Sequence, residues 1–166
     1  MTDQPHGSSA PAPRFHYAKA AEGGYKAMLG LEAFLHSCGL EAGLIHLLKL
    51  RVSQINGCAF CIDMHWKDLR ALGETEQRLY SLGAWHESPF YSDRERAALA
   101  WAEAVTELAD GHVPDEVYRR VRGQFDEQGV ANLTFVVATI NAWNRLAIAS
   151  RTPPGSYQPR KPAQHA

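Results

Sequence analysis

The sequence predicts a small all-α protein of about six to eight helices, and three observations lead to this prediction. Apolar residues recur at helical spacing along most of residues 15–150. Glycines and capping residues fall between these segments. No convincing pair of strands interrupts them. The ends, 1–14 and 151–166, hold seven of the nine prolines, so we expect one domain between a flexible N-terminal tail and a Pro-rich C-terminal tail.

The first two helices differ in the distribution of their apolar residues. Glu22–Ser37 is apolar on one face and ends at Gly39. Glu41–Ile55 is apolar almost all round, which is typical of a helix buried in the centre of a protein. The dipeptide Asn56-Gly57 should break this helix.

The remaining helices follow at regular intervals. The pattern predicts them over Cys58–Leu72, Glu74–Leu82, Arg96–Leu108, from Pro114 to Gly129, and over Val130–Ser150. Gly73 is suited to cap the first of these. Ser92 and Glu95 have the spacing of a capping box just before the predicted helix Arg96–Leu108.

Composition limits the classes of function. The formal net charge is -1, which gives no indication of a basic face for nucleic acid. No apolar run reaches the roughly 18 residues that span a bilayer, and Met1–Arg14 lacks the apolar stretch of a signal peptide. We therefore expect a cytoplasmic protein with reduced thiols, in which three cysteines are too few for a disulfide framework.

The residues with the clearest chemistry are Cys58, Cys61 and His65. At the start of a helix the two cysteines share one face, and the helix dipole stabilises a thiolate there. His65 is four residues beyond Cys61, so it lies on the same face and can accept the thiol proton. A dithiol with a histidine base is suited to two-electron reduction.

Other interpretations of this segment are less favoured. A c-type haem site needs histidine directly after the second cysteine, where Ile62 stands. A zinc site would use Cys58, Cys61 and His65, with His46 or water as the fourth ligand, but no second ligand pair has the usual spacing. Two buried cysteines with a capping histidine are the simplest alternative. We expect neither a metal nor a cofactor.

Further polar residues lie close to the dithiol. Asp63 and Asp68 are expected to face solvent or to pair with the basic residues of their own helix. Either Ser53 or Asn56 could orient a thiol or His65 by hydrogen bonding.

Several motifs resemble the alkylhydroperoxidase D-like branch of the carboxymuconolactone decarboxylase superfamily, most closely over residues 47–106. They are LRVSQINGCAFCIDMH at 50–65, ALGE at 71–74, AW at 84–85, ERAAL at 95–99 and INAWNR at 140–145. The resemblance implies an all-α fold with the CxxC motif at the start of a central helix. It also implies a homo-oligomer, a trimer or a hexamer of dimers, that reduces peroxides and is recycled by an external thiol or disulfide reductant.

The resemblance also assigns roles to the two thiols. It makes Cys61 the thiol that attacks peroxide and Cys58 the resolving thiol. The residues alone leave this choice open, because the helix dipole favours Cys58 while His65 favours Cys61.

Two positions depart from the family pattern. His46 stands twelve residues before Cys58, where the family's proton relay usually has a glutamate. Phe60 stands where the founding members have a histidine. His46 could act as an acid/base group in place of the glutamate, or it could pack as a core histidine.

The leading hypothesis is a thiol-dependent peroxidase with a CxxC dithiol/disulfide cycle and a nearby histidine as acid/base. One alternative is a lyase of the carboxymuconolactone decarboxylase type, although that branch does not rely on a CxxC pair. The other is a non-enzymatic thiol redox sensor.

The relay hypothesis predicts the behaviour of one variant. His46→Phe should slow oxidation of the dithiol by at least roughly tenfold, because the imidazole would no longer transfer protons. Stopped-flow oxidation by peroxide measures this rate. An unchanged rate would contradict a relay role for His46.

Overall fold

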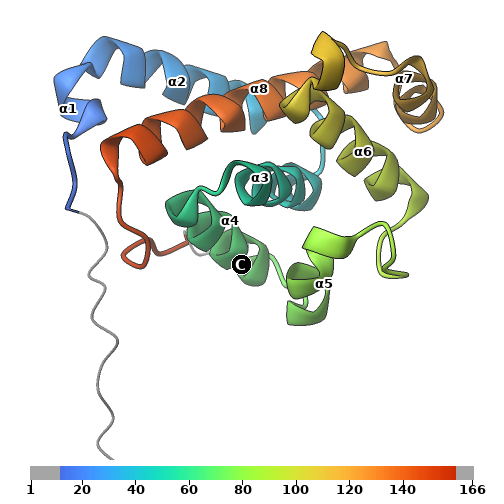
Figure 1. Ribbon diagram of the computed structural model, residues 1–166, viewed down its shortest axis with the longest axis horizontal. Coiled ribbons are helices and arrows are strands. Elements are labelled where there is room, and N and C mark those ends of the chain that lie inside the picture. The colour runs from blue at the N-terminus through green and yellow to red at the C-terminus, as the bar shows by residue number, and fades with distance from the viewer. Residues whose placement is uncertain (1–11, 160–166) are drawn as a thin grey trace, which may run out of the picture.

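The structure is a computed structural model that describes residues 12–159, and within that range it is entirely helical. Eight α-helices and two short 3-10 helices follow one another without a strand in the described residues (Figure 1). They are α1 (Tyr17–Ala20), α2 (Glu22–Leu35), α3 (Ala42–Asn56), α4 (Ala59–Ala71), α5 (Glu76–Ser81), η1 (Leu82–Ala84), α6 (Asp93–Glu107), η2 (Ala109–Gly111), α7 (Asp115–Arg122) and α8 (Glu127–Ser150). The all-α prediction and the expected number of helices are confirmed.

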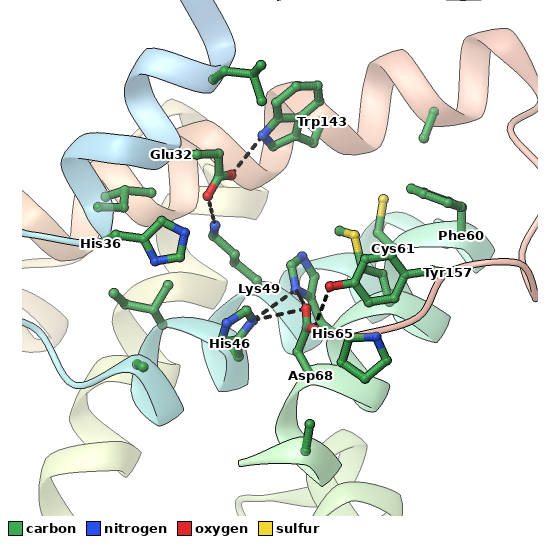
Figure 2. Close-up of a pocket in the computed structure, with 18 of the residues that line it drawn as sticks. Glu32, His36, His46, Lys49, Phe60, Cys61, His65, Asp68, Trp143 and Tyr157 are labelled. Carbon is green, nitrogen blue, oxygen red and sulfur yellow. Dashed lines mark hydrogen bonds and ion pairs between the residues drawn. The ribbon is translucent and has the colours of Figure 1, made fainter. Parts of the chain in front are cut away.

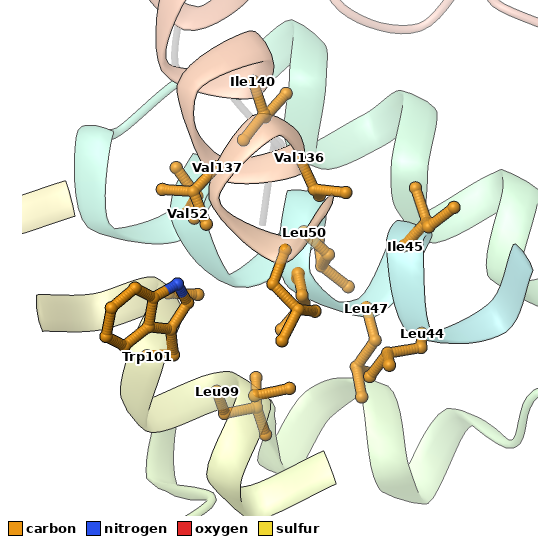
Figure 3. Close-up of a cluster of buried hydrophobic side chains, with 14 of the residues drawn as sticks. Leu44, Ile45, Leu47, Leu50, Val52, Leu99, Trp101, Val136, Val137 and Ile140 are labelled. Carbon is orange, nitrogen blue, oxygen red and sulfur yellow. The ribbon is translucent and has the colours of Figure 1, made fainter. Parts of the chain in front are cut away.

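Helix α3 lies at the centre of the molecule and packs against α4, α6 and α8 (Figure 1). Its apolar side chains point in several directions, so each neighbour covers a different face. Leu47, Leu50 and Val52 are buried, and they meet Leu99 from α6 and Ile140 from α8 in one cluster (Figure 3). The prediction of a central helix here is confirmed.

A tight backbone turn joins α3 to α4. Gly57 has a φ of 69°, a left-handed conformation that glycine adopts without strain. The Gly57 amide donates to the Gln54 carbonyl at 3.3 Å and the Cys58 amide donates to the Ser53 carbonyl at 3.0 Å, the two bonds of a Schellman motif. Cys58 is therefore the N-cap residue of α4, one position before the first helical residue.

Side chains at the end of α3 attach this turn to α8. The Asn56 amide donates to the side-chain oxygens of Asn141 at 2.9 Å and Asn144 at 2.8 Å. The Asn144 amide donates to the Ser53 hydroxyl at 3.0 Å. Ser53 and Asn56 thus hold the turn that carries Cys58. Their side chains bond to α8 and to the α3 backbone, rather than to a thiol or His65 as the sequence suggested.

One predicted helix boundary is wrong. Gly129 does not close a helix; it lies in the first turn of α8, and α7 ends earlier at Arg122. The reason is an N-cap: the Asp126 side chain accepts a hydrogen bond from the Gly129 amide at 2.7 Å. The predicted capping box of Ser92 and Glu95 is present at the start of α6. None of the described helices is both long and apolar enough to cross a membrane.

A partly buried carboxylate connects α3, the residue that follows η1, and α6. Glu103 accepts hydrogen bonds from Arg51 Nε and from the indole of the fully buried Trp85, both at 2.7 Å. Burial opposes ionisation of Glu103, but the Trp85 hydrogen bond and the Arg51 guanidinium outweigh it and hold its pKa below the ordinary value.

Glu103→Gln should lower the free energy of unfolding at pH 7 by about 1–3 kcal/mol, because a charge-assisted interaction is lost. The carboxylate's pKa is depressed in the folded state, so its contribution is complete above the unfolded pKa and is lost as the pH falls through the folded value. The difference from wild type should narrow below about pH 4 in urea titrations. Glu107→Gln, at the exposed end of α6, is the matched control and should change little.

Candidate active site

A cavity of about 680 Å³ opens beside the start of α4 (Figure 2). Helices α2, α3, α4 and α8 and the segment after α8 all contribute to its wall. Much of that wall is aromatic or aliphatic, with contributions from Tyr25, Leu29, Phe60, Met64 and Trp143. Polar groups gather on one side, where Cys61, His65, His46 and Asp68 face the same space.

The two cysteines of the CxxC motif form a disulfide with a Cα–Cα distance of 5.4 Å. Both are almost fully buried, at 0% exposure for Cys58 and 1% for Cys61. The Cys58 sulfur accepts a hydrogen bond from the Cys61 amide at 3.4 Å, which caps α4. Cys61 lines the cavity, whereas Cys58 is not among its described lining residues, so a molecule in the cavity meets Cys61.

The two histidines predicted from the sequence lie side by side. His65 stands one turn after Cys61 on α4 and is 4% exposed. Its Nδ1 lies 3.2 Å from Nδ1 of His46, which projects from α3 (Figure 2). His65 Nε2 is buried and has no hydrogen-bond partner among the described residues. The structure therefore brings all four predicted site residues to one place, and His46 contacts polar groups rather than packing in the core.

Asp68, which the sequence did not identify as a site residue, completes this cluster. Its Oδ2 lies 3.5 Å from His46 Nδ1 and 3.7 Å from His65 Nδ1, and its Oδ1 accepts a hydrogen bond from the Tyr157 hydroxyl at 2.6 Å. The sequence predicts that Asp63 and Asp68 both face solvent or pair with a basic residue of their own helix. This prediction is confirmed for Asp63, which pairs with Lys67 at 2.9 Å, and is wrong for Asp68. The spacing from His65 to Asp68 places both on one helix face and could have indicated the contact.

Protonation states follow from this environment. Burial and the neighbouring His65 lower the pKa of His46 to about 4. Burial also lowers the pKa of His65, although Asp68 opposes the shift. Burial opposes ionisation of Asp68, but the neighbouring His65 and the Tyr157 hydrogen bond outweigh it, so its pKa falls below the ordinary value. At neutral pH the site holds two neutral imidazoles and one carboxylate.

This arrangement leaves one ring nitrogen available for chemistry. The 3.2 Å contact between the Nδ1 atoms of His46 and His65 needs one hydrogen, and when His65 supplies it the negative charge of Asp68, 3.7 Å away, stabilises this tautomer. The Nε2 lone pair is then free to accept a proton. The nitrogen and oxygen atoms of His46, His65 and Asp68 lie within 4.8 Å of one another, which also makes them the described residues most suited to a metal ion.

A second polar group borders the same cavity. Lys49 on α3 is 3% exposed, and its ammonium lies 2.5 Å from Glu32 Oε2 on α2. Glu32 Oε1 accepts a hydrogen bond from the Trp143 indole at 2.8 Å. Burial opposes ionisation of Glu32, but the Lys49 charge outweighs it and lowers its pKa. The ammonium in turn disfavours protonation of both histidines.

The segment after α8 folds back over α4. Lys67 donates to the carbonyls of Gly155 at 3.2 Å and Tyr157 at 3.1 Å, and the Gly155 amide donates to Asp63 at 3.0 Å. Tyr157 and Pro159 line the cavity. Residues 152–159 of the predicted C-terminal tail thus lie against their own chain, while residues 160–166 and most of the N-terminal tail fall outside the described range.

Together, the fold and the site define an all-helical protein with a disulfide-linked CxxC pair at the wall of a cavity. The model of the carboxymuconolactone decarboxylase family matches residues 22–104, half of the chain. The uncharacterized protein YdfG of Bacillus subtilis is 46% identical over 136 residues, which cover 82% of this chain and 92% of YdfG. The chain therefore belongs to the carboxymuconolactone decarboxylase family, within the superfamily that includes the alkylhydroperoxidase D-like proteins.

Solved structures agree with this assignment. ATU0492 from Agrobacterium tumefaciens, a protein of unknown function suggested to be an antioxidant defence protein AhpD, superposes with a TM-score of 0.84 at 42% identity, covering 88% of this chain and all of that one (100%). An alkylhydroperoxidase AhpD core from Ralstonia eutropha, an uncharacterized peroxidase-related protein, gives 0.75 at 19% identity, covering 84% of this chain and 74% of that one. The latter likeness concerns the fold alone.

Asp68→Asn should slow oxidation of the reduced dithiol by at least about tenfold, because the amide no longer fixes the tautomer of His65 or stabilises its protonated form. The imidazole ¹⁵N chemical shifts of His65 should show a mixture of tautomers. Stopped-flow kinetics and NMR measure the two effects. Asp63→Asn, the same change on the same helix, should alter neither. A normal rate with unchanged shifts in Asp68→Asn would rule out this positioning role.

Proposed function

We propose that this chain is a thiol-dependent peroxidase that reduces peroxides through Cys58 and Cys61. The observation that carries the proposal is the position of Cys61: it is disulfide-linked to Cys58 at the start of α4 and lines a cavity shared with His65. Membership of a superfamily that includes alkylhydroperoxidase D-like proteins supports the proposal.

The reaction balances with the groups at the site and one external reductant. The Cys61 thiolate attacks one oxygen of the peroxide, the O–O bond breaks, and an alcohol or water leaves. Cys61 is then a sulfenic acid. The Cys58 thiol displaces its hydroxyl as water and forms the disulfide. An external dithiol reduces this disulfide by exchange and restores both thiols.

His65 is suited to the proton transfers in this cycle. Its ring is neutral at neutral pH, and the unpartnered Nε2 can take the proton of the Cys61 thiol and return it to the leaving oxygen. His46 contacts His65 Nδ1 and Asp68, so in this proposal it supports the protonated ring rather than touching the thiol.

Cys61 is the attacking thiol in this proposal. Its contact with the cavity and its spacing to His65 both favour it, as does the resemblance described above. Cys58 lies at the N-cap, hydrogen-bonded to the Cys61 amide, where it can reach Cys61 without facing the cavity. A homo-oligomer and a cytoplasmic location remain expectations from the sequence.

The family also accommodates a lactone decarboxylase, and a redox sensor would use the same dithiol. Alkylation of the reduced thiols distinguishes these activities. It should abolish peroxide turnover, whereas a decarboxylase would be indifferent to it. A sensor would be oxidised once by peroxide and would show no sustained turnover with any supplied dithiol.

Oxidation of cysteine variants tests the assignment of the two thiols. In a Cys38→Ser background, which removes the third cysteine, peroxide should consume two thiols per chain and a dithiol should restore them. Cys58→Ser should accumulate a sulfenic acid that a dimedone probe traps, because no resolving thiol is present. Cys61→Ser should give no such adduct.

The background variant is itself the control, because Cys38→Ser alone should react at the wild-type rate. Stopped-flow measurements with hydrogen peroxide and with an organic hydroperoxide give these rates. An adduct in Cys61→Ser and none in Cys58→Ser would reverse the roles of the thiols. The absence of reaction with either peroxide would refute the proposed function.

A further inference from the structure

We propose that His46, His65 and Asp68 form a zinc-binding site with one open coordination position, on the wall of the cavity next to Cys61. The site goes beyond the proposed peroxidase activity and does not depend on it. Its ligand set also differs from the cysteine-containing set that the CxxC spacing suggests, because the disulfide leaves neither sulfur available as a thiolate.

The distances between the three ligand atoms fit a tetrahedral ion. His46 Nδ1 and His65 Nδ1 are 3.2 Å apart, and Asp68 Oδ2 lies 3.5 Å from the first and 3.7 Å from the second. Ligands at the usual zinc distances of about 2.0–2.2 Å stand roughly 3.3–3.5 Å from one another in a tetrahedron. Around an octahedral ion such as Mg²⁺, neighbouring ligand atoms would stand only about 3 Å from one another. The observed triangle favours zinc.

The chemistry of the three groups agrees with this geometry. Two imidazole nitrogens and one carboxylate oxygen are ligands that zinc accepts, and an open fourth position is typical of zinc sites that also hold water or a small molecule. Metal binding uses the neutral form of both imidazoles. All three side chains line the cavity, so the fourth position is accessible from it.

The surroundings hold the carboxylate in place as zinc sites require. Asp68 turns Oδ2 toward the two histidines while Oδ1 accepts the Tyr157 hydrogen bond at 2.6 Å (Figure 2). A hydrogen bond to the second oxygen of a ligating carboxylate fixes its orientation and is a common outer contact of metal sites. Three elements, α3, α4 and the segment after α8, therefore converge on one small volume.

The test uses the full-length chain without a histidine tag, in the Cys38→Ser background and with Cys58 and Cys61 oxidised, so that no thiol can bind metal. Isothermal titration calorimetry with Zn²⁺ should show one site per chain. His46→Gln and Asp68→Asn should each weaken binding by at least about tenfold. His36→Gln, which changes another histidine lining the same cavity, is the matched control and should bind as the background does.

Two further measurements keep the result clear if a variant folds poorly. Zn²⁺ should raise the thermal unfolding midpoint of the oxidised chain, and Co²⁺ in its place should give the intense visible bands of a tetrahedral site. Absence of binding, binding that both ligand variants retain, or an octahedral cobalt spectrum would overturn the proposal. Because the protein stays oxidised throughout, these outcomes are independent of peroxidase activity.

Discussion

The burial of α3 on every side determines where the chemistry takes place. A helix covered by α4, α6 and α8 cannot rotate or slide without disrupting several interfaces at once. Its last turn is fixed further by the bonds of Asn56 to Asn141 and Asn144 on α8. The left-handed Gly57 then directs the chain into α4, so the position of Cys58 follows from the packing of α3.

The same helix brings the second polar group to the site. His46 and Lys49 lie three residues apart on one face of α3, and both side chains line the cavity (Figure 2). Because α3 and α4 pack directly against each other, His46 on α3 contacts His65 on α4, and both side chains project from helices rather than from loops. A site built from two packed helices is more rigid than one built on loops, which suits groups that must stay within a few ångströms of each other.

Local spacing predicted much of this site, and long-range contacts explain the remainder. The Cys58, Cys61 and His65 register follows from helix periodicity alone, as does the break at Gly57. Asp68 was within reach of the same reasoning, three residues beyond His65. Tyr157 and Glu32 could not be predicted in this way. Tyr157 contacts a residue 89 positions away in the chain, and Glu32 contacts one 17 positions away. Both contacts depend on how the segment after α8 and helix α2 pack. The last helix begins at Glu127 rather than at the predicted Val130, because Asp126, which the sequence did not identify as a cap, is its N-cap.

The family pattern has a glutamate where this chain has His46, yet a carboxylate still stands beside His65. It comes from Asp68 on α4 instead of from α3, and the histidine at position 46 takes the neighbouring place. His46, His65 and Asp68 together provide two imidazoles and one carboxylate, the composition that a zinc ion can use. The two proposed uses of His65 then exclude each other. Zinc on Nδ1 leaves the ring hydrogen on Nε2, so the nitrogen that would accept the Cys61 proton is already occupied. A zinc-bound chain should therefore hold a dithiol without a base, and the peroxidase cycle should run only in the metal-free form.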